Sequence, residues 1–423
     1  MGLPDIIEII PATGPIHGAI TVPGSKSITN RAMILAALSS GTTRLEGALW
    51  SEDTQVMTEC LQTLGFEVAV EADTNEICNR TITVTGQGGR LPKSGKIDSP
   101  LKLHVGNAGT AARFLSAMVC LGDGVYELSG IDRMHERPQK ALFTSLRELG
   151  YQIDSPNDFL PATFHGTGPR KTSCSVSIEK SSQFASALLL SAKVGEWSIE
   201  IEGDNADNSP YIEMTRRLIE SFPTEGGTFQ IEPDASSGSY IQAANWLTIP
   251  DGGKIETLHW PDSGWQIDAD YPKYLPLPEN VSREEHLGDS IMTAIVMAAF
   301  ADHPVSFTEL GRLRVQECER VEALRTELTK CGCMVEEEGD TLTVHPSDLH
   351  GADIHTYNDH RMAMCFAVAG MKVPGIRIHQ PDCVKKTFPN FFSKLAGPTP
   401  NGLGLTLTDG EGNRLSHESL IAE

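Results

Sequence analysis

The chain has 423 residues and a formal net charge of -22 at pH 7, with 56 Asp and Glu against 34 Lys and Arg. This length predicts roughly two or three domains, and the negative charge argues against a nucleic-acid or anionic-membrane partner. Nine cysteines, scattered and odd in number, indicate reduced thiols rather than a disulfide framework. No stretch is apolar over the roughly 20 residues of a membrane span, and no basic segment precedes an apolar run at the start, so we expect a cytoplasmic protein.

The first distinctive motif is VPGSKSITNR at residues 22–31, which combines a glycine, a lysine and three hydroxyl side chains at the expected start of a helix. It departs from the Walker loop of nucleotide-binding proteins, because Ser25 separates Gly24 from Lys26 and position 19 is an alanine. What remains is typical of an anion site at a helix N-terminus. A capped helix with a solvated lysine is the alternative, and this motif alone does not decide between the two.

Six segments along the chain share one pattern, in which a small polar or glycine-containing opening leads into an apolar helix and then a strand. We expect the apolar helices at 24–38, 106–121, 180–192, 234–247, 288–301 and 358–370. The strands are expected at 42–49, 123–130, 196–203, 252–260, 304–311 and 374–381. Amphipathic helices, with apolar residues three and four apart, are expected between the units, as at 52–65, 137–150 and 317–332. The fourth unit lacks one, because three prolines fall within 266–280.

This repeat predicts an α/β protein of six similar units, because no single unit could bury both faces of its own helices and strands. The six apolar helices are too uniformly hydrophobic for a surface, so we place them inside, between sheets and amphipathic outer helices. Their polar openings would then direct several positive helix ends at one place. Capping of the helices is the simpler role of these openings and is expected as well.

Seven motifs, in order along the chain, carry a resemblance to a known family: PGSKSITNRA, GNAGTAAR, RMHERP, SSQF, PYIEMT, YNDHRMAM and KTFPNFF. In sequence and spacing they resemble the EPSP synthase family of enolpyruvyl transferases over nearly the whole chain. The resemblance implies two similar domains, each of three βαβαββ units around buried central helices, as an inside-out α/β barrel of the EPT/RTPC-like kind. The first domain would span 23–233 and the second 1–22 with 234–423, with the active-site cleft between them.

The resemblance also implies a reaction. Enzymes of this family transfer the enolpyruvyl (1-carboxyvinyl) group of phosphoenolpyruvate to the 5-hydroxyl of shikimate-3-phosphate and release phosphate, in the shikimate pathway to chorismate and the aromatic amino acids. Both substrates are small anions, and converging Lys and Arg side chains can hold them without a metal or a cofactor. We expect a monomer that has no nucleic-acid or membrane partner.

Motif by motif, the resemblance implies the site residues. Asp289 matches the proton acceptor of the family and Glu317 the donor, with Lys26 as a third catalytic group; the assignment of each proton stays open, since His360 and Lys386 are also candidates. Shikimate-3-phosphate would be bound by Lys26, Ser27, Arg31, Ser181, Ser182, Gln183, Asn208, Asp289, Arg312 and Gln316. Phosphoenolpyruvate would be bound by Lys26, Asn107, Gly109, Arg137, Gln183, Arg320, Arg361 and Lys386.

Four residues depart from the family pattern. Most members have an asparagine and, four residues later, a lysine before the donor glutamate, whereas this chain has Arg312 and Gln316, so the cation and the amide are exchanged. Asn208 stands where a serine is usual, and Phe114 where a proline is common. Two alternatives remain open, a shifted acceptor such as UDP-N-acetylglucosamine and a catalytically silent binding homologue. The retained ionisable residues of the motifs argue against the silent homologue.

Overall fold

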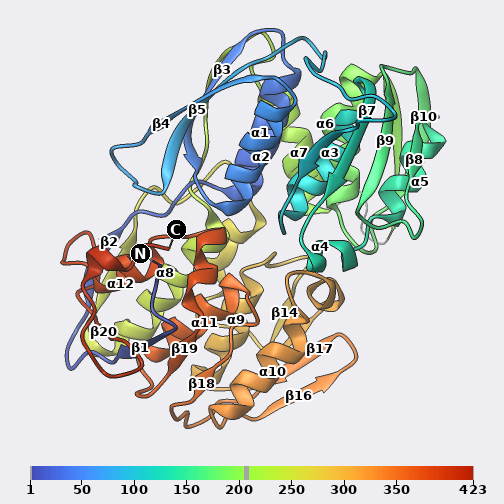
Figure 1. Ribbon diagram of the computed structural model, residues 1–423. Helices are drawn as coiled ribbons and strands as arrows, with labels where there is room; N and C mark the ends of the chain where they lie inside the picture. Colours follow the sequence, from blue (N-terminus) through green and yellow to red (C-terminus); the bar gives the residue numbers. More distant parts are fainter. Residues whose placement is uncertain (1, 204–208, 423) are drawn as a thin grey trace. The chain divides into compact units, whose positions relative to one another are not determined.

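The computed structural model describes residues 2–203 and 209–422 (Figure 1). The chain divides into two compact units. One, here called the split unit, consists of Met1–Pro23 and Pro233–Glu423, and the other, the continuous unit, is Gly24–Glu232. No helix in the described ranges combines the length and the hydrophobicity that a membrane crossing requires.

The continuous unit contains two four-stranded sheets and one two-stranded sheet, with strand orders β12-β3-β5-β4, β6-β7-β9-β8 and β10-β11. In each four-stranded sheet the first pair of strands is parallel and the other two pairs are antiparallel. The two-stranded sheet is parallel. The strands are β3 (Thr42–Leu49), β4 (Glu67–Ala72), β5 (Asn79–Thr85), β6 (Leu101–His104), β7 (Asp123–Ser129), β8 (Gln152–Asp154), β9 (Ala162–Thr167), β10 (Thr172–Ser177), β11 (Trp197–Glu202) and β12 (Gly227–Gln230).

Three apolar helices form the interior of the continuous unit: α1 (Lys26–Leu38), α3 (Gly109–Val119) and α6 (Gln183–Gly195). All residues of α3 are buried, as are those of α1 from Ile28 onward, which fits their Ala-, Leu- and Met-rich sequences. Outer helices bury one face only; in α5 that face carries Leu142, Phe143, Ser145 and Leu146. The outer helices are α2 (Glu52–Thr63), α4 (Asp132–Glu136), α5 (Lys140–Glu148) and α7 (Pro210–Ser221).

The split unit repeats the sheet plan, with strand orders β18-β19-β1-β20, β14-β15-β17-β16 and β13-β2. Each four-stranded sheet again joins one parallel pair to two antiparallel pairs, and β13 runs parallel to β2. The first strand of the chain thus completes a sheet whose other strands come from its last part. The strands are β1 (Ile6–Ile10), β2 (His17–Ile20), β13 (Lys254–Thr257), β14 (Asn280–Ser282), β15 (Val305–Thr308), β16 (Val335–Glu338), β17 (Thr341–Val344), β18 (Asp353–Ile354), β19 (Arg377–His379) and β20 (Thr406–Thr408).

The interior helices of the split unit are α8 (Ala235–Thr248), α9 (Ile291–Met297) and α11 (His360–Gly370). The proline-rich segment forms the 3-10 helix η3 (Ile267–Tyr274), with Pro272 inside it, in place of an outer α-helix. The other helices are α10 (Arg320–Lys330), α12 (Phe391–Ala396), η2 (Ile249–Asp251), η4 (Ala298–Phe300), η5 (Gly311–Val315), η6 (Pro381–Lys386) and η7 (His417–Ser419).

The structure confirms the six-unit α/β pattern expected from the sequence. A central apolar helix overlaps each of the six expected segments, and the strand expected after it is present in every case. These six strands, β3, β7, β11, β13, β15 and β19, each belong to a different sheet and each pair with a parallel neighbour.

Candidate active site

Most of the cations named from the sequence are buried, although the chain as a whole is strongly acidic. A buried charge is costly unless an opposite charge or hydrogen bonds compensate it, so each such side chain needs an account of its partners. Two further arginines share this burial and were given no role from the sequence: Arg113 and Arg283. The buried cations expected in the site are Arg31, Arg137, Arg320, Arg361 and Lys386.

In the continuous unit, side-chain contacts join the N-terminal halves of the three interior helices. Asn30 of α1 donates through Nδ2 to Thr110 Oγ1 of α3, at 3.1 Å. The guanidinium of Arg113 on α3 lies 6.0 Å from the ring centroid of Phe184 on α6. A third contact, from α1 to α6, is made by Arg31. Three helix N-termini, each the positive end of a helix dipole, therefore lie side by side.

Arg31 is held by hydroxyl and carbonyl groups. Its Nε donates to Thr215 Oγ1 at 2.8 Å, its Nη2 to Ser186 Oγ at 3.1 Å and its Nη1 to the carbonyl oxygen of Ser27 at 2.9 Å. Within the described part of the chain this side chain forms no ion pair with a carboxylate. Burial lowers the pKa of Arg31 to about 10, so it remains a cation at neutral pH without a protein counter-charge.

Asn107, Gly109 and Arg137, all expected to bind phosphoenolpyruvate, lie together at the start of α3. Arg137 follows the last residue of α4 and donates through Nη1 to the carbonyl oxygen of Asn107 at 3.0 Å and to its Oδ1 at 3.3 Å. A Cβ atom on Gly109 would lie 2.7 Å from Arg137 Nη2 and 2.7 Å from Arg113 Nη1. The glycine therefore allows two guanidinium groups to approach the N-terminus of α3.

The interior helices of the continuous unit also lack capping by their N-cap side chains. The N-cap residues of α1, α3 and α6 are Ser25, Ala108 and Ser182, and none of the three accepts a capping hydrogen bond through its side chain. At α6 the hydroxyl of Ser181 accepts the N–H of Gln183 at 3.2 Å. Helix N-termini with free N–H groups are ready sites for anions.

Two other expected site residues of this unit have distinct positions. Lys26 is the first residue of α1, and its Nζ lies 3.4 Å from Oδ2 of Asp53, which belongs to the first turn of α2. Ser27 follows it in the first turn of α1. Asn208, expected to contact shikimate-3-phosphate, lies outside the described residues.

Side-chain contacts join the N-terminal halves of α8, α9 and α11 in the split unit in the same manner. Ser239 Oγ of α8 lies 2.8 Å from Thr293 Oγ1 of α9, and Arg361 Nη1 of α11 donates to the hydroxyl of Tyr240 at 3.3 Å. Here two of the three helices are capped by aspartates: Asp234 accepts the N–H of Ser237 at 2.7 Å in α8, and Asp359 caps α11.

Asp289, the expected proton acceptor, is held between two arginines. Arg361 Nη2 lies 3.0 Å from its Oδ2, and Arg283 Nη2 lies 3.1 Å from its Oδ1. Burial by itself would raise the pKa of Asp289, but Arg361 and Arg283 hold it well below the ordinary aspartate value. The carboxylate is therefore ionised at neutral pH, and its side chain keeps 21% of its exposure, so a substrate hydroxyl can reach it.

Arg320, expected to bind phosphoenolpyruvate, is engaged by carboxylates on two sides. It donates to Asp359 through Nε at 2.6 Å and through Nη2 at 3.2 Å, and Nη2 also lies 2.8 Å from Glu317 Oε2. Its Nη1 donates to Oε1 of Gln316. Burial by itself would lower the pKa of Arg320, but Asp359 and Glu317 raise it. The same Asp359 accepts the N–H of Arg361 at 3.0 Å, so one carboxylate caps α11 and fixes Arg320.

Arg312 and Gln316, the cation and the amide that are exchanged relative to the family pattern, have different partners. Arg312 Nη1 lies 3.4 Å from Glu284 Oε1, so a protein carboxylate faces the cation, and burial lowers the pKa of Arg312. Gln316 is the neutral partner of Arg320 described above. His360 begins α11 and Lys386 ends η6, and both are buried.

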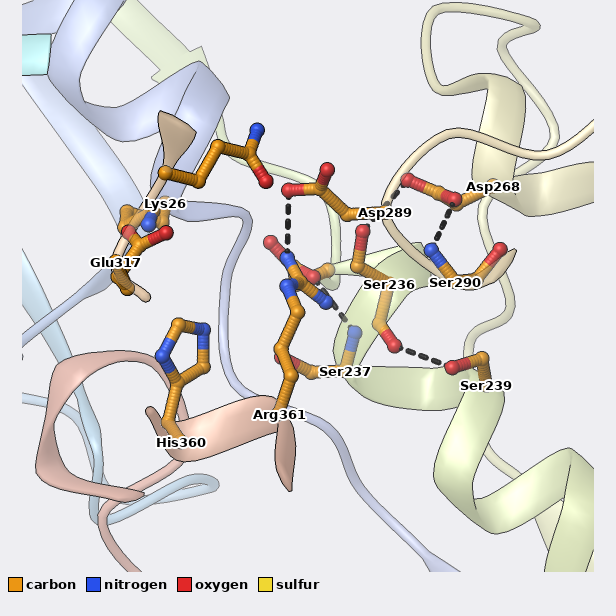
Figure 2. A network of polar contacts seen from close by, with 12 residues as sticks. Lys26, Ser236, Ser237, Ser239, Asp268, Asp289, Ser290, Glu317, His360 and Arg361 are labelled. Carbon is orange, nitrogen blue, oxygen red and sulfur yellow. Dashed lines mark hydrogen bonds and ion pairs between the residues drawn. The ribbon is translucent and has the colours of Figure 1, made fainter. Parts of the chain in front are cut away.

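Asp268 is a buried carboxylate beside Asp289 that the sequence analysis missed. It accepts the N–H of Ser290 at 2.8 Å and the hydroxyl of Ser236 at 2.6 Å, as Figure 2 shows. Burial, and then the charge of Asp289, raise the pKa of Asp268. It lies in the proline-rich segment, where prolines obscured any helical pattern. No group of three or more His, Cys, Asp or Glu side chains in residues 2–203 and 209–422 could hold a metal ion.

Known proteins resemble this chain along most of its length. A family model described as EPSP synthase (3-phosphoshikimate 1-carboxyvinyltransferase) matches residues 10–261 and 257–395. The 3-phosphoshikimate 1-carboxyvinyltransferase of Trichormus variabilis is 35% identical over 92% of this chain and 98% of its own length. The enzyme of the same name from Rhizobium etli is 38% identical over 92% and 96%.

Two solved structures share the fold. The EPSP synthase of Acinetobacter baumannii superimposes with a TM-score of 0.74 and 22% identity over 96% of this chain and 100% of that one. The enolpyruvyl transferase NikO of Streptomyces tendae gives 0.68 and 16% over 96% and 99%. On the family model and the relatives above 30% identity, the chain belongs to the EPSP synthase family.

Proposed function

We propose that this protein is a 3-phosphoshikimate 1-carboxyvinyltransferase: it transfers the enolpyruvyl group of phosphoenolpyruvate to the 5-hydroxyl of shikimate-3-phosphate and releases phosphate. Family membership over nearly the whole chain supports this reaction. The structural observation that carries it is the buried guanidinium of Arg31, which has hydroxyl and carbonyl partners but no carboxylate in the described ranges. A charge in that setting is stabilised when a phosphate or carboxylate binds beside it.

We assign shikimate-3-phosphate mainly to the first turns of α1 and α6. The N-termini of these helices, which their N-cap side chains do not cap, supply N–H donors, and Arg31 supplies a charge-assisted donor in a planar fork that matches a phosphate. Arg312 and Gln316 of the split unit, with Asn208, complete the proposed contacts. Those of the continuous unit are Lys26, Ser27, Arg31, Ser181, Ser182 and Gln183.

Phosphoenolpyruvate is assigned to the start of α3 and to cations of the split unit. The close approach of Arg137 to Gly109 places a guanidinium beside a helix N-terminus that no N-cap side chain caps, a combination that suits a carboxylate or a phosphate. The proposal requires residues of both units to act on the same pair of substrates. The proposed contacts are Lys26, Asn107, Gly109, Arg137, Gln183, Arg320, Arg361 and Lys386.

The chemistry is an addition followed by an elimination. Asp289 takes the proton of the 5-hydroxyl as the oxygen of that hydroxyl bonds to C2 of phosphoenolpyruvate. The C2–C3 π electrons take a proton from the acid form of Glu317 to form a methyl group, which leaves Glu317 as a carboxylate. A methyl proton is then removed, the C2–C3 double bond re-forms and the C2–O bond to phosphate breaks. Lys26, His360 and Lys386 remain candidates for the proton transfers of the second step.

The charges around Asp289 give this base a dependence on substrate. Arg361 and Arg283 hold the pKa of Asp289 low, which makes it a weak base. An anionic substrate that binds Arg361 competes with Asp289 for the guanidinium, and this competition raises the basicity of the carboxylate. Asp289 would therefore reach its full strength as a base only when the substrates are present. We further propose that the enzyme works as a monomer in the cytoplasm.

The test is phosphate release from phosphoenolpyruvate, measured with shikimate-3-phosphate, with UDP-N-acetylglucosamine and without an acceptor. Release with shikimate-3-phosphate alone is expected and would show that the exchange of Arg312 and Gln316 is tolerated. Release with UDP-N-acetylglucosamine instead would mean that the acceptor has changed. No release from folded protein with either acceptor would support the silent homologue and refute the proposal.

A further inference from the structure

We propose that Arg283 is a positioning residue for this reaction, which fixes the orientation of the Asp289 carboxylate from the side opposite Arg361. This inference rests on the proposed function and adds a residue that no sequence motif indicated. Arg283 follows β14 directly, its N–H donates to the carbonyl oxygen of Thr308 at 3.2 Å, and its side chain is 6% exposed.

The geometry at the carboxylate supports a role in orientation. Each oxygen of Asp289 is held by a different arginine, Oδ1 by Arg283 at 3.1 Å and Oδ2 by Arg361 at 3.0 Å. The two arginines come from different elements, the turn after β14 and the first turn of α11. Two anchors on the two oxygens fix both the rotation and the tilt of the carboxylate plane, which one anchor alone would leave free.

The turn that carries Arg283 is itself held in one conformation. Ser282 Oγ accepts the N–H groups of Glu284 at 3.1 Å and Glu285 at 3.0 Å, and the N–H of Ser282 donates to His286 Nδ1 at 3.0 Å. The ring of His286 packs against Tyr274, with 5.2 Å between the ring centroids. The guanidinium therefore projects from a turn that is ordered before substrate arrives, as accurate positioning requires.

The two exchanged residues, Arg312 and Gln316, have partners other than Asp289. Arg312 is paired with Glu284, and Gln316 is neutral and bound to Arg320. The ionisable groups that face Asp289 come from several elements. They are Arg361 of α11, Arg320 of α10, Glu317 before that helix, Asp268 of η3 and Arg283 itself.

The Nε atom of Arg283 adds a second observation. It is buried and has no hydrogen-bond partner in the described part of the chain, and the same holds for Nε of Arg361. Each guanidinium thus donates to Asp289 through Nη2, while its Nε makes no hydrogen bond among the described residues. In the described part of the chain, the ion pair with Asp289 is therefore the side-chain polar contact that holds Arg283 in place.

The experiment is a double-mutant cycle on kcat, with KM measured for both substrates. In the otherwise unaltered protein, Arg283→Met is expected to lower kcat roughly 10- to 100-fold and to change either KM by only a few-fold, because orientation of the base is lost. Arg283→Lys, which keeps a charge, should retain more activity. In an Asp289→Ala background, Arg283→Met should lower kcat almost no further, because Arg283 acts by orienting the Asp289 carboxylate, which that background lacks.

The outcomes separate this inference from the proposed function. An unaltered protein that is inactive with both substrates refutes the function. An active protein in which Arg283→Met leaves kcat unchanged, or lowers it equally in both backgrounds, refutes the role of Arg283 alone. If Arg283→Met does not fold, as judged by circular dichroism, the cycle is run with Arg283→Lys under the same criteria.

A matched control distinguishes loss of an arginine from loss of this arginine. Arg377 of β19 lies in the same unit and donates to Asp353 at 2.6 Å, but both side chains are more than a third exposed. Arg377→Met should keep kcat within about twofold, since exposed ion pairs contribute little. A loss as large as that of Arg283→Met would attribute the effect to the unit's stability and would overturn the proposal.

Discussion

The two units share one plan of helices and sheets but treat the N-termini of their interior helices in opposite ways. In the continuous unit Arg31 and Arg137 are buried with no carboxylate paired to them among the described residues, and no N-cap side chain caps α1, α3 or α6. In the split unit Arg320 and Arg361 are bound to carboxylates, and aspartates cap α8 and α11.

This difference suits the two units to different roles, one to binding anions and the other to proton transfer. Buried cations without counter-charge favour the binding of anions, because the ligand supplies what the protein lacks. Proton transfer needs carboxylates, and carboxylates in a buried site need cations to stay ionised. The continuous unit is therefore suited to hold anionic substrates, and the split unit to carry the acid and base groups. Four changes test this division.

The largest expected effect is on the stability of the split unit. Arg320→Met leaves Asp359 and Glu317 without their buried cation, and loss of one partner of a buried pair costs roughly 3–5 kcal/mol. Urea unfolding of the ligand-free protein should show this loss. The control is Arg325→Met on the same helix, where a partly exposed pair with Glu337 should contribute no more than about 1 kcal/mol. Equal losses from the two variants would contradict the contrast between the units.

The second test concerns the base. Asp289→Ala should lower kcat by at least about 100-fold, as expected for a positioned acid or base group, while circular dichroism shows an unchanged fold. Asp289→Asn keeps the shape and one acceptor but cannot take the proton, so it should be nearly as inactive. Near-normal turnover of either variant would remove Asp289 from the mechanism.

The third test is the counterpart of the first in the continuous unit. Arg31→Met should weaken binding of shikimate-3-phosphate by roughly 100-fold, because charge-assisted hydrogen bonds to the substrate contribute about 1.5–3 kcal/mol. The ligand-free protein should be as stable as before or more so, since an uncompensated buried charge is removed. Arg44→Met, at an exposed pair of the same unit, is the control for both measurements. If Arg31→Met destabilises as much as Arg320→Met, then its charge is compensated within the protein.

The elements of this fold could be predicted because their signals are local. The interior helices are marked by apolar composition and a polar opening, and β3 has the bounds expected from the sequence, 42–49. The break at η3 followed from its prolines. The pairings inside the site could not be predicted in this way. Arg283 stands in a run of charged residues that reads as a solvated turn, and its contact with Asp289 depends on how that turn closes.

The same limit applies to Arg312 and Asp268. The sequence indicates that a cation and an amide are exchanged, but only the structure places Glu284 beside Arg312. Asp268 contacts Ser236 and Ser290, which belong to two different elements, so no spacing along the chain predicts these contacts. Motifs could thus name the residues that we propose to contact substrate, whereas the side chains that hold those residues depend on long-range contacts.

The smallest expected effect tests the close approach at the start of α3. A Cβ added by Gly109→Ala would lie 2.7 Å from a terminal nitrogen of both Arg113 and Arg137, and such atoms, at the far ends of flexible side chains, can move aside. The fold should therefore persist, while the guanidinium of Arg137 leaves its position beside Asn107. We expect KM for phosphoenolpyruvate to rise about 10-fold and thermal stability to change little, since alanine favours a helix over glycine.

The control for this change is Gly14→Ala, where a Cβ would meet no atom within 4 Å, and it should leave both KM values unaltered. If Gly109→Ala raises KM for phosphoenolpyruvate alone, this substrate is linked to the start of α3. A larger rise for shikimate-3-phosphate would instead exchange the two assignments, because Arg31 and Arg137 act from different helix ends. The division between an anion-binding unit and an acid–base unit would survive that result, since it depends on the partners of the arginines and not on which anion each one meets.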